Sequence, residues 1–398
     1  MNIVFLETDT LGTDMNFDRF SELGEVTLYK RSSPRENPLR ITDADIVVAN
    51  KIPINEELLK YASNVKFIAA SATGTNNIDF TYTNSRGIKV ANARGYSTDS
   101  VAQHTFAMLF YLYEKLHTYD HFVKDGEYSE YPMFSCFVPY FNELSGKTWG
   151  IIGLGAIGVL VANAATHMGM EVYGYDPYIS VSAAWSLSRS VKHISNVEDI
   201  YRECDYITIH VPLLDSTRKM IGADAIAMMK PTAIVLNFAR DLLVDEEAMV
   251  DALAAGKIKK YVSDFPNTTT VGAKGCIVTP HLGASTAESE DNCALMAVRE
   301  IRDYLENGNI VHSVNFPDCS MGACMTAGRI GILHKNESGM LSHFTTILGN
   351  AGINIDGMAN KSRGDYAYAL IDVDTNVPED VLAKLEQTDG VLNVRKVK

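Results

Sequence analysis

The segment Gly153-Leu-Gly155-Ala156-Ile157-Gly158 has the residue types and spacing of a loop that wraps a diphosphate. It follows an apolar run, residues 148–152, and precedes a stretch with helical periodicity, residues 159–168. In such a loop the first Gly permits a tight turn, the second lets a phosphate approach the backbone, and the third lets the helix pack against the strand. The helix N-terminus then offers free N–H groups and a positive dipole to the anion. The segment therefore predicts a dinucleotide site.

Asp176 stands at the end of the next apolar run, residues 171–175. A carboxylate at this place accepts hydrogen bonds from ribose hydroxyls and repels a 2′-phosphate. Residues 177–179 contain no Arg or Lys that could neutralise such a phosphate. We therefore expect NAD, rather than NADP, as the cofactor.

Arg240 and His281 each follow an expected strand, residues 233–237 and 276–279. In open α/β sheets, ligands bind beyond the carboxyl ends of the strands. A guanidinium grips a carboxylate through two parallel hydrogen bonds, and an imidazole exchanges protons near neutral pH. Next to a nicotinamide, the pair predicts oxidation of a 2-hydroxy acid, with Arg240 on the carboxylate and His281 taking the hydroxyl proton. Taken singly, Arg240 could also be a solvated loop end and His281 a helix-capping histidine.

The order of apolar runs predicts an α/β protein with two Rossmann-like, doubly wound parallel sheets and a C-terminal ferredoxin-like βαββαβ unit. Strands are expected at residues 2–7, 25–29, 44–49, 66–70, 89–91, 148–152, 171–175, 206–210, 233–237, 261–263 and 276–279. Helices are expected at residues 55–62, 99–116, 159–168 and 288–306, and residues 315–322 have the composition of a linker. The tail is expected to form a separate unit with strands at 329–334 and 392–397, helices at 340–351 and 379–387, and two strands that meet at Arg363-Gly364-Asp365.

The composition excludes several classes of function. With 398 residues, several domains are expected, and a net charge of −14 argues against a nucleic-acid partner. Apolar runs are too short for a membrane span, and the N-terminus lacks the basic start of a signal peptide. The six scattered cysteines form no C-x-x-C pair. We therefore expect a cytoplasmic protein with reduced thiols, without disulfides and without a bound metal.

These motifs, with Asp264 and Pro280-His281-Leu282-Gly283, resemble those of the D-isomer-specific 2-hydroxyacid dehydrogenases over about residues 45–318. The resemblance implies a substrate domain of residues 1–98 and 286–318 around an NAD domain of residues 99–285. It implies that His281 is the acid/base, that Arg240 binds the carboxylate and that Asp264 lies near the nicotinamide. The implied cofactor residues are Gly153, Gly155, Ala156, Ile157, Gly158, Asp176, His210, Val211, Pro212, Phe238, Ala239, Arg240, Asp264, His281 and Gly283.

Residues 325–398 resemble an ACT regulatory domain, because His334-Lys-Asn336-Glu-Ser-Gly339 is close to its H-x-N-x-P-G turn. A terminal ACT domain is typical of the branch that oxidises D-3-phosphoglycerate to 3-phosphohydroxypyruvate, the first step of L-serine biosynthesis. This likeness implies a homo-oligomer, a dimer or tetramer, with L-serine bound between two ACT domains as a feedback effector. The implied effector residues are His334, Asn336 and Asn354.

Two departures from the family pattern keep alternatives open. Thr269 stands where the family places a Glu that orients the catalytic His, which leaves an NAD-sensing binding protein without turnover as one alternative. The segments 70–77, 93–97 and 100–104 resemble instead the glycerate dehydrogenases, or hydroxypyruvate reductases. A phosphate needs cationic partners, for which Lys51 and Arg94 are the candidates, with Arg35 or Lys30 as further ones; Lys51 could equally be a surface loop lysine. The expected substrate residues are Asn50, Lys51, Ser71, Thr73, Gly74, Arg94 and Arg240.

Overall fold

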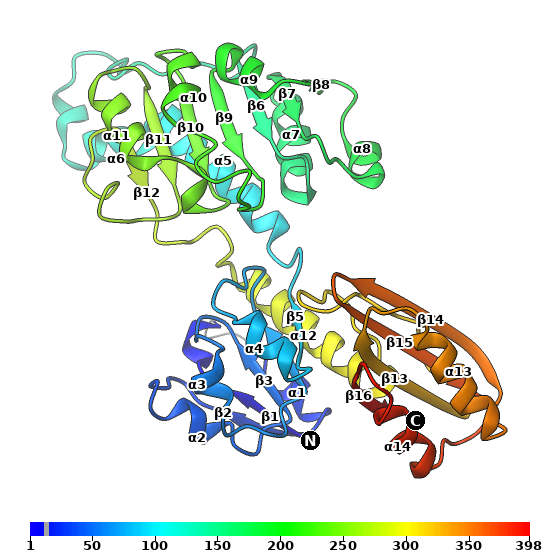
Figure 1. Ribbon diagram of the computed structural model, residues 1–398. Helices are drawn as coiled ribbons and strands as arrows, with labels where there is room; N and C mark the ends of the chain where they lie inside the picture. Colours follow the sequence, from blue (N-terminus) through cyan, green and yellow to red (C-terminus); the bar gives the residue numbers. More distant parts are fainter. Residues whose placement is uncertain (12–15) are drawn as a thin grey trace. The chain divides into compact units, whose positions relative to one another are not determined.

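The computed structural model describes residues 1–11 and 16–398, which divide into two compact units (Figure 1). One unit comprises Met1–Tyr96 and Ala287–Lys398, and the other comprises Ser97–Thr286. We call them the outer unit and the inserted unit, after their places in the sequence. Among the described residues, no helix is both long and apolar enough to cross a membrane.

The inserted unit contains a seven-stranded parallel sheet of order β12-β11-β10-β9-β6-β7-β8. Its central strands β6, β9, β10 and β11 are buried on both faces, by two apolar cores, as their near-continuous apolar sequences predict. The strand order reverses between β6 and β9, which is the crevice where doubly wound sheets bind dinucleotides. The strands are β6 (Thr148–Ile152), β7 (Glu171–Tyr175), β8 (Lys192–His193), β9 (Tyr206–Ile209), β10 (Ile234–Asn237), β11 (Lys260–Ser263) and β12 (Cys276–Val278).

Helices cover both faces of this sheet. Val101 and Leu109 of α5 share one core with Val159 and Val161 of α7, whereas the other core includes Met249 of α11. The helices are α5 (Thr98–Glu114), α6 (Leu116–Lys124), α7 (Ala156–His167), α8 (Val181–Ser186), α9 (Val197–Glu203), α10 (Ala223–Met228) and α11 (Glu246–Ala254).

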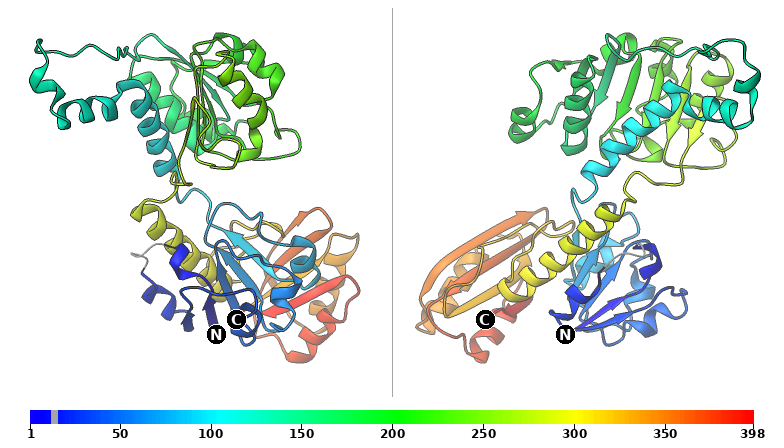
Figure 2. Two further views of the ribbon diagram at one scale, coloured as in Figure 1. Left: turned by 90° about the vertical axis from the view of Figure 1, so that its left-hand side faces the viewer. Right: turned by 180° about the vertical axis from the view of Figure 1, so that it is seen from behind.

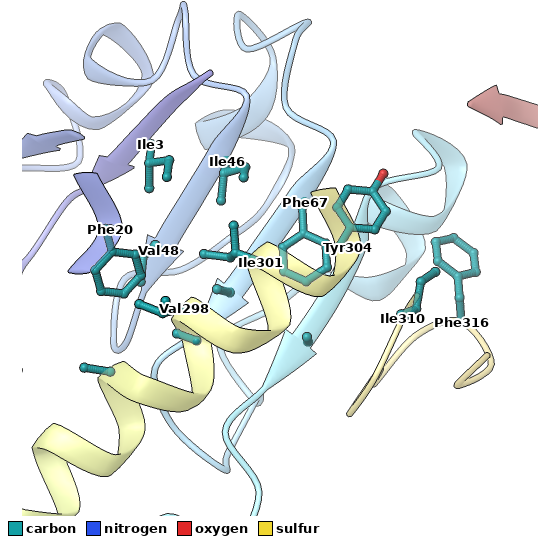
Figure 3. Close-up of a cluster of buried hydrophobic side chains, with 14 of the residues drawn as sticks. Ile3, Phe20, Ile46, Val48, Phe67, Val298, Ile301, Tyr304, Ile310 and Phe316 are labelled. Atoms are coloured by element: carbon teal, nitrogen blue, oxygen red, sulfur yellow. The ribbon is translucent and has the colours of Figure 1, made fainter. Parts of the chain in front are cut away.

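The outer unit begins with a five-stranded parallel sheet of order β2-β1-β3-β4-β5. One face packs on the long helix α12 (Ala287–Asn307), where Ile301 and Tyr304 lie against Phe67 in a continuous apolar core (Figure 3). The strands are β1 (Asn2–Phe5), β2 (Glu25–Leu28), β3 (Ile46–Ala49), β4 (Phe67–Ala70) and β5 (Lys89–Asn92). The short helices are α1 (Asp18–Ser21), α2 (Asn37–Arg40), α3 (Glu56–Leu59) and α4 (Phe80–Ser85).

The chain ends in a four-stranded antiparallel sheet of order β14-β15-β13-β16. One face is covered by α13 and α14, and Leu333, Tyr368 and Leu370 of the other face join the core around α12. Helix α12 therefore runs between the two sheets of the outer unit (Figure 2). The elements are β13 (Gly328–Lys335), α13 (Met340–Asn350), β14 (Ile355–Arg363), β15 (Tyr366–Val373), α14 (Glu379–Glu386) and β16 (Val391–Lys396).

These observations confirm the predicted α/β class with two parallel sheets and a βαββαβ tail. Three local expectations differ. The tail packs into the outer unit instead of standing apart, and residues 315–322 are not a loose linker. Phe316 is fully buried, and Asn315 accepts a hydrogen bond from the Val90 N–H (3.0 Å) and donates one to the Ile88 carbonyl (2.8 Å). The helix expected at residues 99–116 is also interrupted, because Lys115, with a φ of 56°, ends α5 and separates it from α6.

Candidate active site

The glycine loop follows β6 and leads into α7, as the sequence predicts. Gly153 has a φ of +96°, and a Cβ there would meet the His210 carbonyl oxygen at 2.8 Å and the Val211 side chain at 2.9 Å. A Cβ on Gly158 would meet the Gly153 oxygen at 2.0 Å, whereas one on Gly155 would have no neighbour within 4 Å among the described residues. The open space at Gly155, beside a helix without a side-chain cap, fits a pyrophosphate.

Asp176 lies directly beside this loop. Its Oδ2 accepts a hydrogen bond from the Leu154 N–H (2.8 Å), and its Oδ1 accepts one from the Tyr178 N–H (2.8 Å). These bonds fix the carboxylate at the end of β7 and leave further lone pairs for ribose hydroxyls. The residues present therefore fit NAD.

His210 and Pro212 follow β9 on the other side of the crevice. Burial lowers the pKa of His210 to about 4, and its Nε2 lies 3.2 Å from the Thr208 hydroxyl. The ring is therefore neutral at pH 7. This neutrality suits a wall of the cofactor pocket better than a proton-transfer group.

Arg240 lies beyond the end of β10, where Phe238 and Ala239 lead out of the sheet. The Asn237 amide donates a hydrogen bond to the Arg240 carbonyl (2.7 Å), and the Arg240 guanidinium donates one to the Ala239 carbonyl (2.6 Å). Both bonds are local. The position of the guanidinium therefore follows from the end of the strand that carries it.

His281 lies beyond β12, in a loop that Asp264 holds from beyond β11. The Asp264 carboxylate accepts hydrogen bonds from the N–H groups of Leu282 (2.7 Å) and Gly283 (2.6 Å) and from the Thr279 hydroxyl (2.6 Å). His281 itself has a φ of 61°, which is uncommon for a residue with a side chain. Such a backbone persists where its surroundings fix it, as Asp264 does here.

The sequence reasoning missed His104 and Glu246. His104, on α5, places its Nε2 3.3 Å from the Thr279 hydroxyl and 3.9 Å from Asp264 Oδ1, and burial lowers its pKa. Glu246 opens α11, where its carboxylate accepts hydrogen bonds from the Tyr261 hydroxyl (3.1 Å) and from the Asn267 amide. Burial raises the pKa of Glu246. The sequence carried no signal for either residue, because His104 lies within a helix and Glu246 opens one, as many surface residues do.

Asn267 carries the loop in which Thr269 replaces the Glu of the family pattern. Its Oδ1 accepts the N–H groups of Thr269 (2.9 Å) and Thr270 (3.1 Å), and the ring of Phe265 in the same loop lies edge-on to His281, with centroids 5.2 Å apart. Glu246 thus holds the loop that contacts His281, although its position in the sequence is not position 269, where the family pattern places its Glu.

In the outer unit, the expected substrate residues follow β3, β4 and β5 at the carboxyl edge of the parallel sheet. Glu7 Oε1 accepts the N–H groups of Asn50 (2.8 Å), Lys51 (2.6 Å) and Ile52 (2.8 Å). These three N–H groups are already paired. The loop therefore has the Lys51 ammonium, rather than its backbone, to offer to a phosphate.

The loop after β4 contains Ser71, Thr73 and Gly74. The Ser71 hydroxyl is buried and has no hydrogen-bond partner among the described residues, whereas the Thr73 hydroxyl donates to the Ala93 carbonyl (2.8 Å). An unsatisfied buried hydroxyl costs free energy, and a bound ligand could pair it. Arg94, after β5, donates to the Asn92 side chain (3.2 Å) and to the Ser313 carbonyl (2.9 Å).

The expected effector residues do not converge within one copy of the chain. His334 is buried with both ring nitrogens paired, to the Lys335 carbonyl and to Asn360. Asn336 directly follows the last residue of β13. Asn354 directly precedes β14, whose first residue pairs with Val373 of β15, and Val373 pairs in turn with Gly328 at the start of β13. Strand geometry separates them by roughly 20 Å or more. A ligand that contacts both must lie between two copies.

Comparisons with known proteins agree with this geometry. Residues 106–283 match the D-isomer specific 2-hydroxyacid dehydrogenase, NAD binding domain, and residues 328–390 match the ACT domain. A hydroxypyruvate reductase of Blautia hydrogenotrophica is 34% identical over 327 residues, which cover 79% of this chain and all of that protein. A D-3-phosphoglycerate dehydrogenase of Haemophilus influenzae is 29% identical, covering 88% of this chain and 85% of that one.

Among solved structures, the NAD⁺-bound 3-phosphoglycerate dehydrogenase of Entamoeba histolytica matches with a TM-score of 0.64 and 27% identity, over 79% of this chain and 98% of that one. The chain thus belongs to the D-isomer-specific 2-hydroxyacid dehydrogenase family. It is an NAD-dependent dehydrogenase of this family with a C-terminal ACT domain, which confirms the predicted class, cofactor and tail.

Proposed function

We propose that this chain oxidises D-3-phosphoglycerate to 3-phosphohydroxypyruvate, the first step of L-serine biosynthesis. The observation that carries the proposal is the order of Arg240, Asp264 and His281 beyond three adjacent strands, β10, β11 and β12. At this edge of the sheet, the Arg240 guanidinium can bind a substrate carboxylate, and the His281 imidazole, on a loop held by Asp264, can accept a proton. NAD, when bound, accepts the hydride.

Arg240 binds the substrate carboxylate through two N–H groups and sets the orientation of the carbon that carries the hydroxyl. His281 accepts the hydroxyl proton as the hydride leaves and returns it in the reverse reaction. Asp264, His104 and Glu246 position the loops that carry His281 and its neighbour Phe265. Their support replaces the orientation that a Glu at position 269 gives in the family pattern.

The outer unit supplies the remaining substrate contacts in this proposal. Residues 1–98 and 286–318 act as the substrate domain, and residues 99–285 act as the NAD domain. The Ser71 hydroxyl, which has no hydrogen-bond partner in the described part of the chain, binds polar groups of the substrate together with Asn50, Thr73 and Gly74. The Lys51 ammonium and the Arg94 guanidinium bind its phosphate.

A second candidate is reduction of hydroxypyruvate to glycerate. The match to the Blautia hydrogenotrophica hydroxypyruvate reductase, over all of that protein and 79% of this chain, favours it, as does the pairing of the Asn50–Ile52 N–H groups with Glu7. Steady-state kinetics of the purified chain in both directions separates the two candidates. A kcat/KM for phosphohydroxypyruvate at least tenfold above that for hydroxypyruvate supports the first candidate, and the reverse ratio overturns it.

We further propose that residues 325–398 regulate the enzyme by binding L-serine between two copies. The chain then works as a homodimer or tetramer. The segment of residues 134–140 supports self-association, because it exposes large apolar side chains: Phe134, Val138 and Tyr140 are 92%, 67% and 77% exposed. Sedimentation across a concentration series tests this assembly. A purely monomeric enzyme with full activity would exclude it.

A further inference from the structure

Residues 312–318 form a strap between β5 and the C-terminal sheet of the outer unit. The Val314 N–H donates to the Val90 carbonyl (3.0 Å), and Ser313 pairs with Ala91 in an antiparallel bridge. On the other side, the buried ring of Phe316 packs edge-on against Tyr366, the first residue of β15, with centroids 5.3 Å apart. The strap thus contacts both sheets.

Two arginines, one from each side, share a single carbonyl of this strap. The Ser313 carbonyl accepts a hydrogen bond from Arg94 (2.9 Å) and another from Arg363 (3.0 Å), and Arg363 also donates to the Phe316 carbonyl (3.2 Å). Asp318, also in the strap, accepts the Ser313 N–H (2.5 Å) and lies 4.0 Å from the Arg94 guanidinium. Arg363 therefore fixes the carbonyl that orients Arg94.

Arg363 also leads into the turn that holds Asn336. The backbone N–H of Asn336 donates to the Asp365 carbonyl (2.8 Å), and its side-chain amide donates to the Gly364 carbonyl (3.1 Å). A continuous series of hydrogen bonds and chain segments consequently runs from Asn336 through residues 363–365 and the Ser313 carbonyl to Arg94. Such a contiguous network is the physical requirement for coupling two sites.

We propose that Arg363 is a positioning residue for Arg94 and that the strap transmits the state of the Asn336 turn to the substrate site. The inference rests on the proposed role of Arg94 in binding substrate. A ligand that draws the Asn336 amide away from Gly364 moves the turn, and the turn moves the donor that fixes the Ser313 carbonyl. Arg94 then loses its orientation, so the affinity for substrate falls while the machinery at Arg240 and His281 is unchanged.

The test compares Arg363→Ala and Arg363→Lys with the matched control Arg395→Ala. Arg395 also joins the C-terminal sheet to the rest of the outer unit, by donating to the carbonyls of Tyr304 (2.5 Å) and Leu305 (2.7 Å) on α12, and within the described part of the chain its hydrogen bonds go to α12 rather than to the strap. We expect Arg363→Ala to raise the KM for the hydroxy acid roughly fivefold to tenfold, with kcat and the KM for NAD unchanged. Lys retains the positive charge but lacks the planar guanidinium with its several N–H donors, so Arg363→Lys should give an intermediate KM.

An equal rise of KM in Arg395→Ala would overturn the proposal, because any loosening of the sheet would then suffice. Hydrogen–deuterium exchange provides a readout that needs no turnover. Arg363→Ala should speed exchange in residues 91–96 and 310–318, whereas Arg395→Ala should not; unchanged exchange in Arg363→Ala overturns the coupling even if the substrate assignment is correct. L-serine should raise the KM of the unmodified enzyme and have a smaller effect on Arg363→Ala, and an equal effect on both would overturn transmission through the strap.

Discussion

The Asp264 carboxylate accepts the backbone N–H of Gly283 at 2.6 Å and thereby anchors the loop that carries His281. The same carboxylate accepts the Leu282 N–H and the Thr279 hydroxyl. In Asp264→Asn, an amide NH₂ faces one of these donors, so at least one charge-assisted hydrogen bond is lost, at about 1.5–3 kcal/mol. We expect kcat to fall roughly tenfold to 100-fold, measured by NADH formation. A kcat within twofold of the unmodified enzyme would contradict this role.

Arg240 is expected to bind the substrate carboxylate. Arg240→Ala should reduce kcat/KM by roughly 100-fold or more, because the reacting carbon is no longer held in place. Arg240→Lys keeps the charge but not the planar fork, and should recover only a small part of the loss. Fluorescence titration should show unchanged NAD affinity in both variants. A weaker NAD affinity would indicate a cofactor role instead.

Gly155 and Gly158 provide a matched pair in the nucleotide loop. In Gly155→Ala the new methyl group has no neighbour within 4 Å among the residues that the structure describes, so the melting temperature should hold. NAD affinity should fall, because the methyl occupies the space proposed for the pyrophosphate. In Gly158→Ala the methyl meets the Gly153 carbonyl, so stability should fall by about 1–3 kcal/mol. Thermal unfolding and NAD titration distinguish the two effects. Unchanged NAD affinity in Gly155→Ala would place the pyrophosphate elsewhere.

Glu246 and Glu247 stand side by side at the start of α11, but only Glu246 holds the Asn267 loop. Glu246→Gln should lower kcat several-fold and alter its pH profile, because a carboxylate with a raised pKa leaves the network. Glu247 is exposed, and Glu247→Gln should leave both quantities unchanged. Identical profiles for Glu246→Gln and the unmodified enzyme would exclude Glu246 as a positioning residue.

Glu300 on α12 predicts a pH-dependent stability. Burial raises its pKa to about 8, against an opposing effect of Arg94 and with a reinforcing one of Asp318, and the carboxyl lies 2.7 Å from His312 Nδ1, whose own pKa burial lowers. Because the folded-state pKa is raised, unfolding releases this proton between about pH 4.5 and 8. The free energy of unfolding therefore falls by up to about 1.4 kcal/mol per pH unit as the pH rises through that window. Above it, this group causes no further change.

Glu300→Gln removes the titrating group while keeping its size and a hydrogen bond to His312. Chemical denaturation of both proteins at pH 6, 7 and 8 should show the unmodified protein losing stability relative to the variant as the pH rises. A difference in unfolding free energy that is constant over this range would show that Glu300 is ionised in the folded protein at pH 6.

Apart from the two-residue β8, the strands of both parallel sheets and the βαββαβ order of the tail were within reach of sequence reasoning, since buried strands need uninterrupted apolar runs and the motifs fall at their ends. The positions of Gly153, Asp176, Arg240 and His281 follow in the same way, because each depends on the strand directly before it. Local geometry accounts for all of them.

Tertiary structure alone decided which distant residues meet. Asp264 accepts the N–H of Leu282, the neighbour of His281, Glu246 holds a loop 21 residues away, and Arg363 reaches a carbonyl 50 residues before it. The segment 315–322 has the composition of a linker, yet Phe316 is buried because two separate sheets supply its apolar surroundings. Composition and periodicity report what a segment can form by itself, whereas these contacts depend on where the rest of the chain places its partners.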